Sequence, residues 1–135
     1  MHHKFINSFG NYYSIDTGKI IYCTVKDHLS EIFCEGDNSY SINKSLKQIS
    51  ESLGKNFFRC HKSHLINICY IKKFLPGELK IIFQNNKEIK VSRRQKPKLI
   101  KLLNSYNKNG GGKIHYVRQL GFSESIRSRF LPIAT

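Results

Sequence analysis

Residues 57–67, FFRCHKSHLIN, combine several kinds of chemically versatile side chain in one short segment. Six polar or ionisable residues, 59–64, lie between the apolar pairs Phe57-Phe58 and Leu65-Ile66. Three kinds of chemistry fit this composition. The segment is a metal site, a nucleophile with its base, or a chain reversal that donates hydrogen bonds to a large anion.

The metal interpretation depends on His61 and His64, which have the spacing H-x-x-H. On a helix this spacing places both imidazoles on one face, but the flanking residues here are typical of strands. Residues three apart on one strand point to opposite faces of the sheet. No acidic residue lies nearby in the sequence, so we expect no zinc site.

The nucleophile interpretation depends on Cys60, which is followed directly by His61. Adjacent side chains on a strand diverge, and a catalytic thiol and its base are normally brought together by folding. The sequence also lacks a glycine-rich phosphate loop, a GxSxG motif and paired carboxylates. We therefore expect no enzyme activity and no cofactor.

The third interpretation is a surface that contacts nucleic acid. Short donors on a rigid base suit phosphate oxygens and base edges, and a guanidinium fork can bind a phosphate or guanine through two hydrogen bonds. Three basic loops on one β scaffold favour this interpretation over three unrelated solvated loops. The loops are KDHLS (26–30) with Lys26 and His28, the tip with Lys62, Ser63 and His64, and VSRRQK (91–96) with Arg93 and Arg94.

The overall composition supports a polyanionic partner. The chain has 135 residues, with 23 Lys and Arg against nine Asp and Glu, which gives a net charge of +14. Such a balance favours nucleic acid or an anionic membrane surface. No apolar run approaches the roughly 20 residues of a membrane helix, and the N-terminus lacks a signal-peptide core, so we expect a cytoplasmic protein. The four cysteines show no C-x-x-C spacing and are expected to be buried thiols.

The elements that would position these loops are mainly strands. Ser45 and Gln48 form a capping-box pattern and Gly54 follows as a C-terminal cap, which predicts one short helix between them. Pro97 fits the first turn of a second helix. The other segments predict strands and turns: strands within 5–36, 40–42, 57–60, 64–74, 78–83 and 87–92, with turns at 37–38, 76–77 and 84–86.

The composition changes at NKNGGG, residues 107–112, where three glycines predict a flexible joint. We therefore predict one domain over residues 1–107, followed by a glycine-linked basic tail over 108–135. The tail is expected either to dock on the domain or to remain an extension. The main body carries 18 − 8 = +10 of the charge, so its basic character does not depend on the tail.

The segment FFRCHKSHLIN resembles the signature of the LytTR family of bacterial DNA-binding domains, roughly F-x-R-x-H-x-S-x-x-x-N. The matching residues are Phe57, Arg59, His61, Ser63 and Asn67. Segments elsewhere in residues 12–105 resemble the family's early strand, short helix, next strand and v-S-R-r segment. The residues F-F-R-C-H are similar to the corresponding residues in the AgrA-like branch of the family.

The resemblance implies a mainly β fold of about ten short strands in stacked antiparallel sheets, with a short helix near 45–53 and a C-terminal helix near 97–105. It also implies double-stranded promoter DNA as partner, contacted by loops rather than by a recognition helix. The implied base contacts are Lys62, Arg94 and His28. The implied backbone contacts are Ser63, Arg93, Gln95, Lys96 and Lys26, with Arg59 and His61 bracing the tip.

This function implies a transcription regulator with no membrane and no small-molecule substrate, and it makes two molecules on a repeated site plausible. The chain has no room for an acidic phosphoacceptor domain before residue 12, so we expect a stand-alone regulator or an isolated output domain. Two rivals remain open. An RNA- or ribosome-associated basic β-domain would expose aromatic side chains on one sheet face for base stacking. A protein-interaction module would show no salt-sensitive binding to any duplex.

Overall fold

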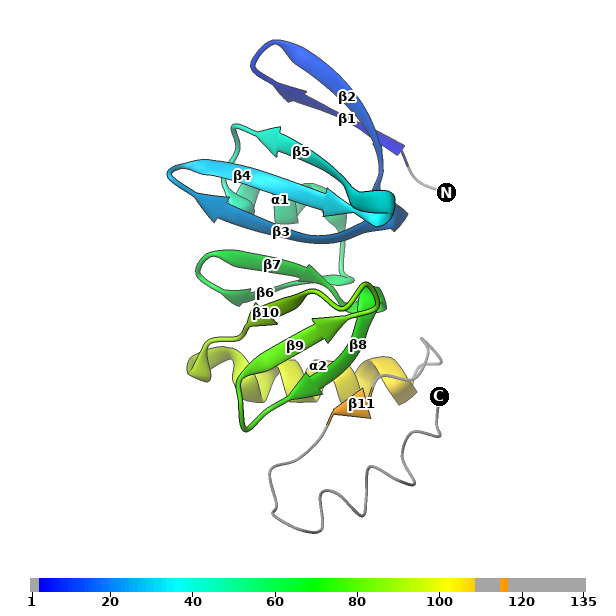
Figure 1. The fold of residues 1–135 in the computed structure, drawn as a ribbon, viewed down its shortest axis with the longest axis vertical. Coiled ribbons are helices and arrows are strands. Elements are labelled where there is room, and N and C mark those ends of the chain that lie inside the picture. The colour runs from blue at the N-terminus through cyan, green and yellow to red at the C-terminus, as the bar shows by residue number, and fades with distance from the viewer. Residues whose placement is uncertain (1–2, 109–114, 117–135) are drawn as a thin grey trace. The chain divides into compact units, whose positions relative to one another are not determined.

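The structure is a computed structural model that describes residues 3–108 and 115–116. The chain forms two compact units (Figure 1). The N-terminal unit ends at Ile68 and the C-terminal unit begins at Cys69. The expected mainly β class is confirmed: ten strands pair antiparallel in three sheets, and β11 adds a parallel partner to β8. The helices are α1 (Leu46–Leu53) and α2 (Lys96–Lys108), and the strands are β1 (His3–Ser8), β2 (Asn11–Asp16), β3 (Ile20–Lys26), β4 (Leu29–Cys34), β5 (Asn38–Ile42), β6 (Phe57–His61), β7 (His64–Asn67), β8 (Ile71–Leu75), β9 (Lys80–Phe83), β10 (Glu88–Lys90) and β11 (His115–Tyr116).

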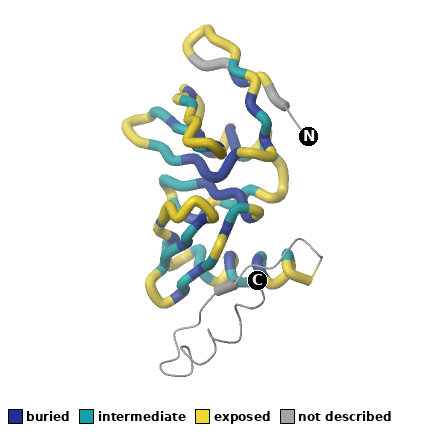
Figure 2. The backbone as a smooth tube through the Cα atoms, turned by 45° about the vertical axis from the view of Figure 1, so that its right-hand side comes forward, coloured by how far each residue is buried: buried dark blue, intermediate teal, exposed yellow. Residues whose placement is uncertain are grey.

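A five-stranded antiparallel sheet in the order β5-β4-β3-β7-β6 forms most of the N-terminal unit. Strand β3 is central and buried along most of its length, whereas β4 alternates between buried and half-buried residues. This alternation is the pattern of a strand with one face in the core. Buried residues follow the middle of the strands and exposed residues gather at the turns (Figure 2).

Helix α1 forms where the sequence predicts it, because both of its ends are satisfied locally. The Ser45 hydroxyl accepts a hydrogen bond from the Gln48 amide at 3.1 Å, and the Gln48 side chain accepts one from the Ser45 amide at 2.9 Å. Gly54 ends the helix with a φ of +99°, which suits glycine. Leu46 and Ile49 are buried in the core that the sheet shares.

The hairpin β1–β2 is a separate two-stranded sheet at the start of the chain. Phe9 and Gly10 make its two-residue turn, closed by the pair Ser8 and Asn11. Ile6 and Ile15 are buried in the core of the N-terminal unit, so one face of the hairpin is anchored there. This packing is needed because an isolated two-stranded hairpin is marginally stable in water.

The C-terminal unit contains the sheet β10-β9-β8-β11 and helix α2. The predicted hairpin between the strands now seen as β9 and β10 and the turn at Pro76-Gly77 are confirmed. Helix α2 begins at Lys96, and Pro97, which has no N–H to donate, fits its first turn because amides there have no intrahelical acceptor. Leu99 and Leu103 are fully buried one turn apart.

Two features differ from the sequence predictions or lie beyond what the structure describes. Cys23, Cys34 and Cys60 are buried as expected, but Cys69 is exposed and its sulfur accepts a hydrogen bond from the Tyr106 hydroxyl at 3.4 Å. The prediction of four buried thiols was therefore wrong for Cys69. The predicted basic tail of 108–135 falls outside the described residues, apart from Lys108 and the backbone of β11. Within the described ranges, no helix is long and apolar enough to cross a membrane.

Candidate nucleic-acid interface

The turn between β3 and β4 is shorter than the predicted loop of residues 26–30. Lys26 and Leu29 already pair across the hairpin, and Ser30 is fully buried in β4, so only Asp27 and His28 form the turn. Their φ angles are +51° and +66°, the signs of a type I′ hairpin turn. Asp and His are among the few residue types that adopt this backbone region. The tight turn leaves His28 exposed at a fixed position.

The turn between β6 and β7 consists of Lys62 and Ser63 and is held by its own neighbours. The Arg59 guanidinium donates from Nε to the His61 carbonyl at 3.1 Å and from a terminal nitrogen to the Lys62 carbonyl. The Ser63 amide donates to Nδ1 of His61 at 3.0 Å. These bonds fix the backbone on both sides of Lys62, whose side chain is exposed.

The two histidines of this turn face each other, contrary to the sequence prediction. His61 and His64 pair across the hairpin, with ring centroids 4.9 Å apart. The prediction placed them on opposite faces because it counted positions along one strand, whereas a two-residue reversal separates them. Burial, and then the nearby His61, lowers the pKa of His64. Among residues 3–108 and 115–116, no three His, Cys, Asp or Glu side chains gather as metal ligands would.

Both turns lie at the same end of the five-stranded sheet, because β3 pairs with β4 on one side and with β7 on the other (Figure 1). Thr24 of β3 is opposite His64 of β7, the first residue after the β6–β7 turn. The Val25 amide also donates to the Ser63 carbonyl at 3.0 Å, which ties the β6–β7 turn directly to the end of β3. The sheet therefore holds the two turns as one rigid group.

Lys44 lies at the same end of the sheet and was missed by the sequence analysis. Ser30 pairs with Ile42, the last residue of β5, and its buried hydroxyl donates to the Lys44 carbonyl. This hydrogen bond fixes the exposed segment that carries Lys44 next to the start of β4. The signal in the sequence was Ser30, a hydroxyl at an inward position of an alternating strand that needs a buried partner.

The third predicted segment forms the entrance to α2 in the C-terminal unit. Residues Arg93–Gln95 make a 3-10 turn, and the Ser92 hydroxyl accepts from the Gln95 amide at 3.2 Å. Arg93 and Arg94 are exposed, and Lys96 begins the helix. The first turn of α2 has no acidic residue, so the positive end of the helix dipole adds to these cations. This combination attracts an anion.

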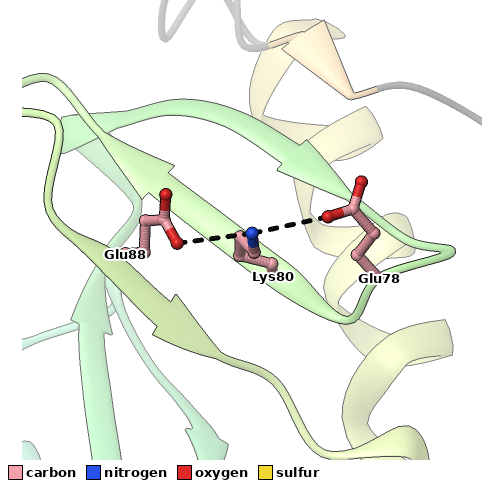
Figure 3. Close-up of polar contacts among 3 residues, drawn as sticks. All are labelled: Glu78, Lys80 and Glu88. Atoms are coloured by element: carbon pink, nitrogen blue, oxygen red, sulfur yellow. Dashed lines mark ion pairs between the residues drawn. The ribbon is translucent and has the colours of Figure 1, made fainter.

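The ion pairs within the described residues are made by Lys80, which lies outside the three predicted contact segments. Lys80 lies between Glu78 and Glu88, at 3.4 and 3.3 Å from their carboxylates (Figure 3). In the part of the chain that the structure describes, no carboxylate lies within ion-pairing distance of the cations at the three predicted segments. These cations are Lys26, Lys62, Arg93, Arg94 and Lys96.

Cys60 is unsuited to nucleophilic chemistry. Its side chain is fully buried, and this burial raises the pKa of the thiol to about 12. The thiolate, which is the reactive species, is therefore scarce at neutral pH. The neighbouring His61 is half-buried and makes its hydrogen bond to Ser63 instead.

Most aromatic side chains in the described ranges are half-buried, and the fully buried and the exposed ones lie in different parts of the fold. Phe74 and Phe83 are fully buried, as a DNA-binding β scaffold with basic loops would have them. Large hydrophobic side chains that are exposed within the described ranges gather on the β1–β2 hairpin, and they are Phe5, Phe9 and Tyr12. This hairpin lies outside the three predicted contact segments.

Comparisons with known proteins show the family and the fold of this chain. The family model described as the LytTr DNA-binding domain matches residues 10–104. Among solved structures, a LytTr DNA-binding domain from Bacillus cereus superimposes with a TM-score of 0.65 at 23% sequence identity, covering 75% of this chain and 95% of that chain. That structural likeness shows a shared fold. A comparison with curated proteins finds no match.

Proposed function

Since this chain belongs to the LytTR family of DNA-binding domains, we propose that it regulates transcription by binding a specific sequence of double-stranded DNA through its turns. The observation that carries this proposal is the pair of turns held at one end of a rigid sheet, with exposed Lys62 and His28 at their tips. The Bacillus cereus relative is described as part of a response regulator, which supports a regulatory role.

Base recognition in this proposal comes from Lys62, His28 and Arg94. The forked guanidinium of Arg94 suits the O6 and N7 acceptors of guanine, and the Lys62 ammonium is a donor to the same edge. His28 offers an imidazole nitrogen from a turn whose two residues have left-handed φ. Fixed turns suit this task because a donor that is already positioned loses little entropy on binding.

Backbone contacts supply most of the affinity. The cations that we assign to phosphates are Lys26, Arg93, Lys96 and the newly located Lys44, and Ser63 and Gln95 would donate neutral hydrogen bonds. Four neutralised phosphates predict that log K falls with log salt concentration with a slope of roughly −4 per bound molecule. Contacts of Lys62 and Arg94 with phosphates would steepen this slope.

Arg59 and His61 are assigned a bracing role. Their hydrogen bonds to the backbone of residues 61–63 support this assignment, because they hold the segment that presents Lys62. The proposed DNA-binding domain covers residues 1–107, as a stand-alone regulator or as the output domain of a longer one. Two molecules on a repeated site would extend recognition, since one small module contacts few base pairs.

The test is selection of bound duplexes from a random pool, followed by a salt titration of the selected sequence and of a scrambled duplex. We expect one enriched motif, and tighter binding to it than to the scrambled duplex at every salt concentration. Recovery of no motif, with equal binding to both duplexes, would refute sequence-specific recognition. Preference for single-stranded RNA over the duplex would favour the rival function instead.

A further inference from the structure

The β1–β2 hairpin carries an exposed aromatic surface that the proposed DNA contacts leave unused. Phe5, Phe9 and Tyr12 are 74%, 66% and 69% exposed. The opposite face of the same hairpin is anchored by the buried Ile6 and Ile15. We call the three exposed residues the aromatic hairpin surface.

The register of the hairpin places two of these side chains on one face. Phe5 is opposite Ser14 and Tyr12 is opposite Asn7, so Phe5 and Tyr12 occupy diagonal positions on the same face. Phe9 is at the tip with a φ of +52°. A bulky aromatic residue is unfavourable in this backbone region, and such outliers are concentrated at binding surfaces.

The charge distribution indicates what kind of partner fits. Residues 5–15 contain no Lys, Arg, His, Asp or Glu, and they are the longest such stretch in a chain of net charge +14. Stacking platforms for single-stranded nucleic acid combine aromatic rings with a positive groove, which this stretch does not provide. A second copy of the chain, repelled elsewhere by its own positive charge, can approach at this uncharged surface.

We propose that two copies of this chain contact each other through the aromatic hairpin surface when they occupy neighbouring DNA sites. The contact is isologous, so the same three residues serve on both molecules. This inference rests on the proposed DNA binding. The family match begins at residue 10, so Phe5 of β1 and Phe9 of the turn lie outside the matched segment.

The size of the surface explains why the contact needs DNA. Aromatic side chains each bury about 150–250 Å² when covered, so three of them at about 70% exposure offer roughly 400 Å² per copy. Two copies would bury roughly 800 Å², below the roughly 1,200 Å² of stable interfaces. The association is therefore weak in solution and effective when DNA holds two copies at millimolar effective concentration.

The first experiment measures binding to duplexes that carry one or two copies of the selected sequence, at varied spacing and in both orientations. Wild-type protein is expected to bind one arrangement of two sites with at least fivefold cooperativity. Phe9→Asn creates the Asn-Gly pair favoured in type I′ turns, so it should raise the melting temperature while weakening cooperativity. Phe5→Ser combined with Tyr12→Ser should abolish cooperativity, and Gln84→Ser on the exposed β9–β10 turn is the matched control.

The affinity for a single site distinguishes failure of the proposed DNA binding from failure of the hairpin contact. Failure of wild-type protein to bind a single site would contradict the DNA-binding function itself. Normal single-site binding without cooperativity on any two-site duplex would overturn only the hairpin contact. Cooperativity that survives in both hairpin variants would overturn it as well.

A second experiment needs no DNA. In a dilution series followed by NMR, the amide signals of residues 5–12 should shift with protein concentration in the wild type but not in Phe9→Asn. Added salt should strengthen this self-association, because it screens the repulsion between the two chains. Binding of the hairpin to nucleic acid would show the opposite salt dependence. Concentration-independent signals up to millimolar protein would count against the proposal.

Discussion

The substitution Arg59→Lys tests the hydrogen bonds by which Arg59 braces the β6–β7 turn separately from the positive charge of this residue. In the native protein, Arg59 donates two hydrogen bonds, to the carbonyl of His61 just before the turn and to the carbonyl of Lys62, the first residue of the turn. Lysine keeps the positive charge but is a single point donor that cannot reproduce the planar fork. The substitution therefore loosens the backbone that presents Lys62 while leaving the net charge at +14.

The expected loss follows from these two bonds. A net hydrogen bond contributes about 0.5–1.5 kcal/mol, and bonds from a charged donor contribute more when they are buried. Arg59 is exposed, so we assign about 1 kcal/mol to each bond and allow that lysine recovers part of one. A loss of about 1–2 kcal/mol in preorganisation corresponds to a roughly 5- to 30-fold weaker affinity for the selected duplex.

The assay is fluorescence anisotropy with the selected and the scrambled duplex over a series of salt concentrations. We expect weaker binding to the selected duplex, nearly unchanged binding to the scrambled one, and an unchanged salt slope because the charge is conserved. The free energy of unfolding should fall by no more than about the same 1–2 kcal/mol, because these two bonds also stabilise the folded turn. Wild-type affinity for the selected duplex would refute the bracing role, and equal losses on both duplexes would indicate a phosphate contact.

Three further predictions concern recognition, thiol reactivity and pH. Arg94→Ala should cost about 1–3 kcal/mol on the selected duplex and relax its sequence preference, whereas Lys96→Ala should weaken all duplexes alike; equal losses for both variants would contradict the assignment. In a labelling experiment on native protein, iodoacetamide should modify the exposed Cys69 well before the buried Cys60, whose pKa is raised to about 12, and the reverse order would contradict the structure. Because the pKa of His64 is lowered in the folded protein, the unfolded protein takes up a proton at this residue first, and the free energy of unfolding should fall as pH drops below about 6.5. This part of the fall should be missing in His64→Gln, and identical pH profiles for the two proteins would contradict a role of His64.

Local chemistry explains why the sequence predicted most elements. The capping box of Ser45 and Gln48, the glycine after α1 and the alternation in β4 each depend on neighbours within a few residues. The signature between Phe57 and Asn67 is equally local, and it was sufficient to indicate the family that the comparison then showed. These features need no knowledge of which strands pair.

The errors arose where the answer depended on a chain reversal or on distant partners. His61 and His64 face each other because the chain turns between them, which a count along one strand cannot show. Cys69 is exposed because it lies in the 3-10 turn Ile68–Tyr70 between β7 and β8, although its neighbours in the sequence are apolar. In both cases the direction of a side chain depends on where a strand starts or ends.

The sequence by itself therefore determined most of the strands and helices, the positive charge, and most of the residues that we propose as DNA contacts. Only the tertiary structure decided that the β3–β4 turn, the β6–β7 turn and Lys44 share one end of a sheet. That arrangement depends on the pairing of β3 with β7, about 40 residues apart, and on a buried hydroxyl bonded to a distant carbonyl. Pairing between distant strands is set by the packing of the whole core, and so it leaves no mark in any single stretch of sequence.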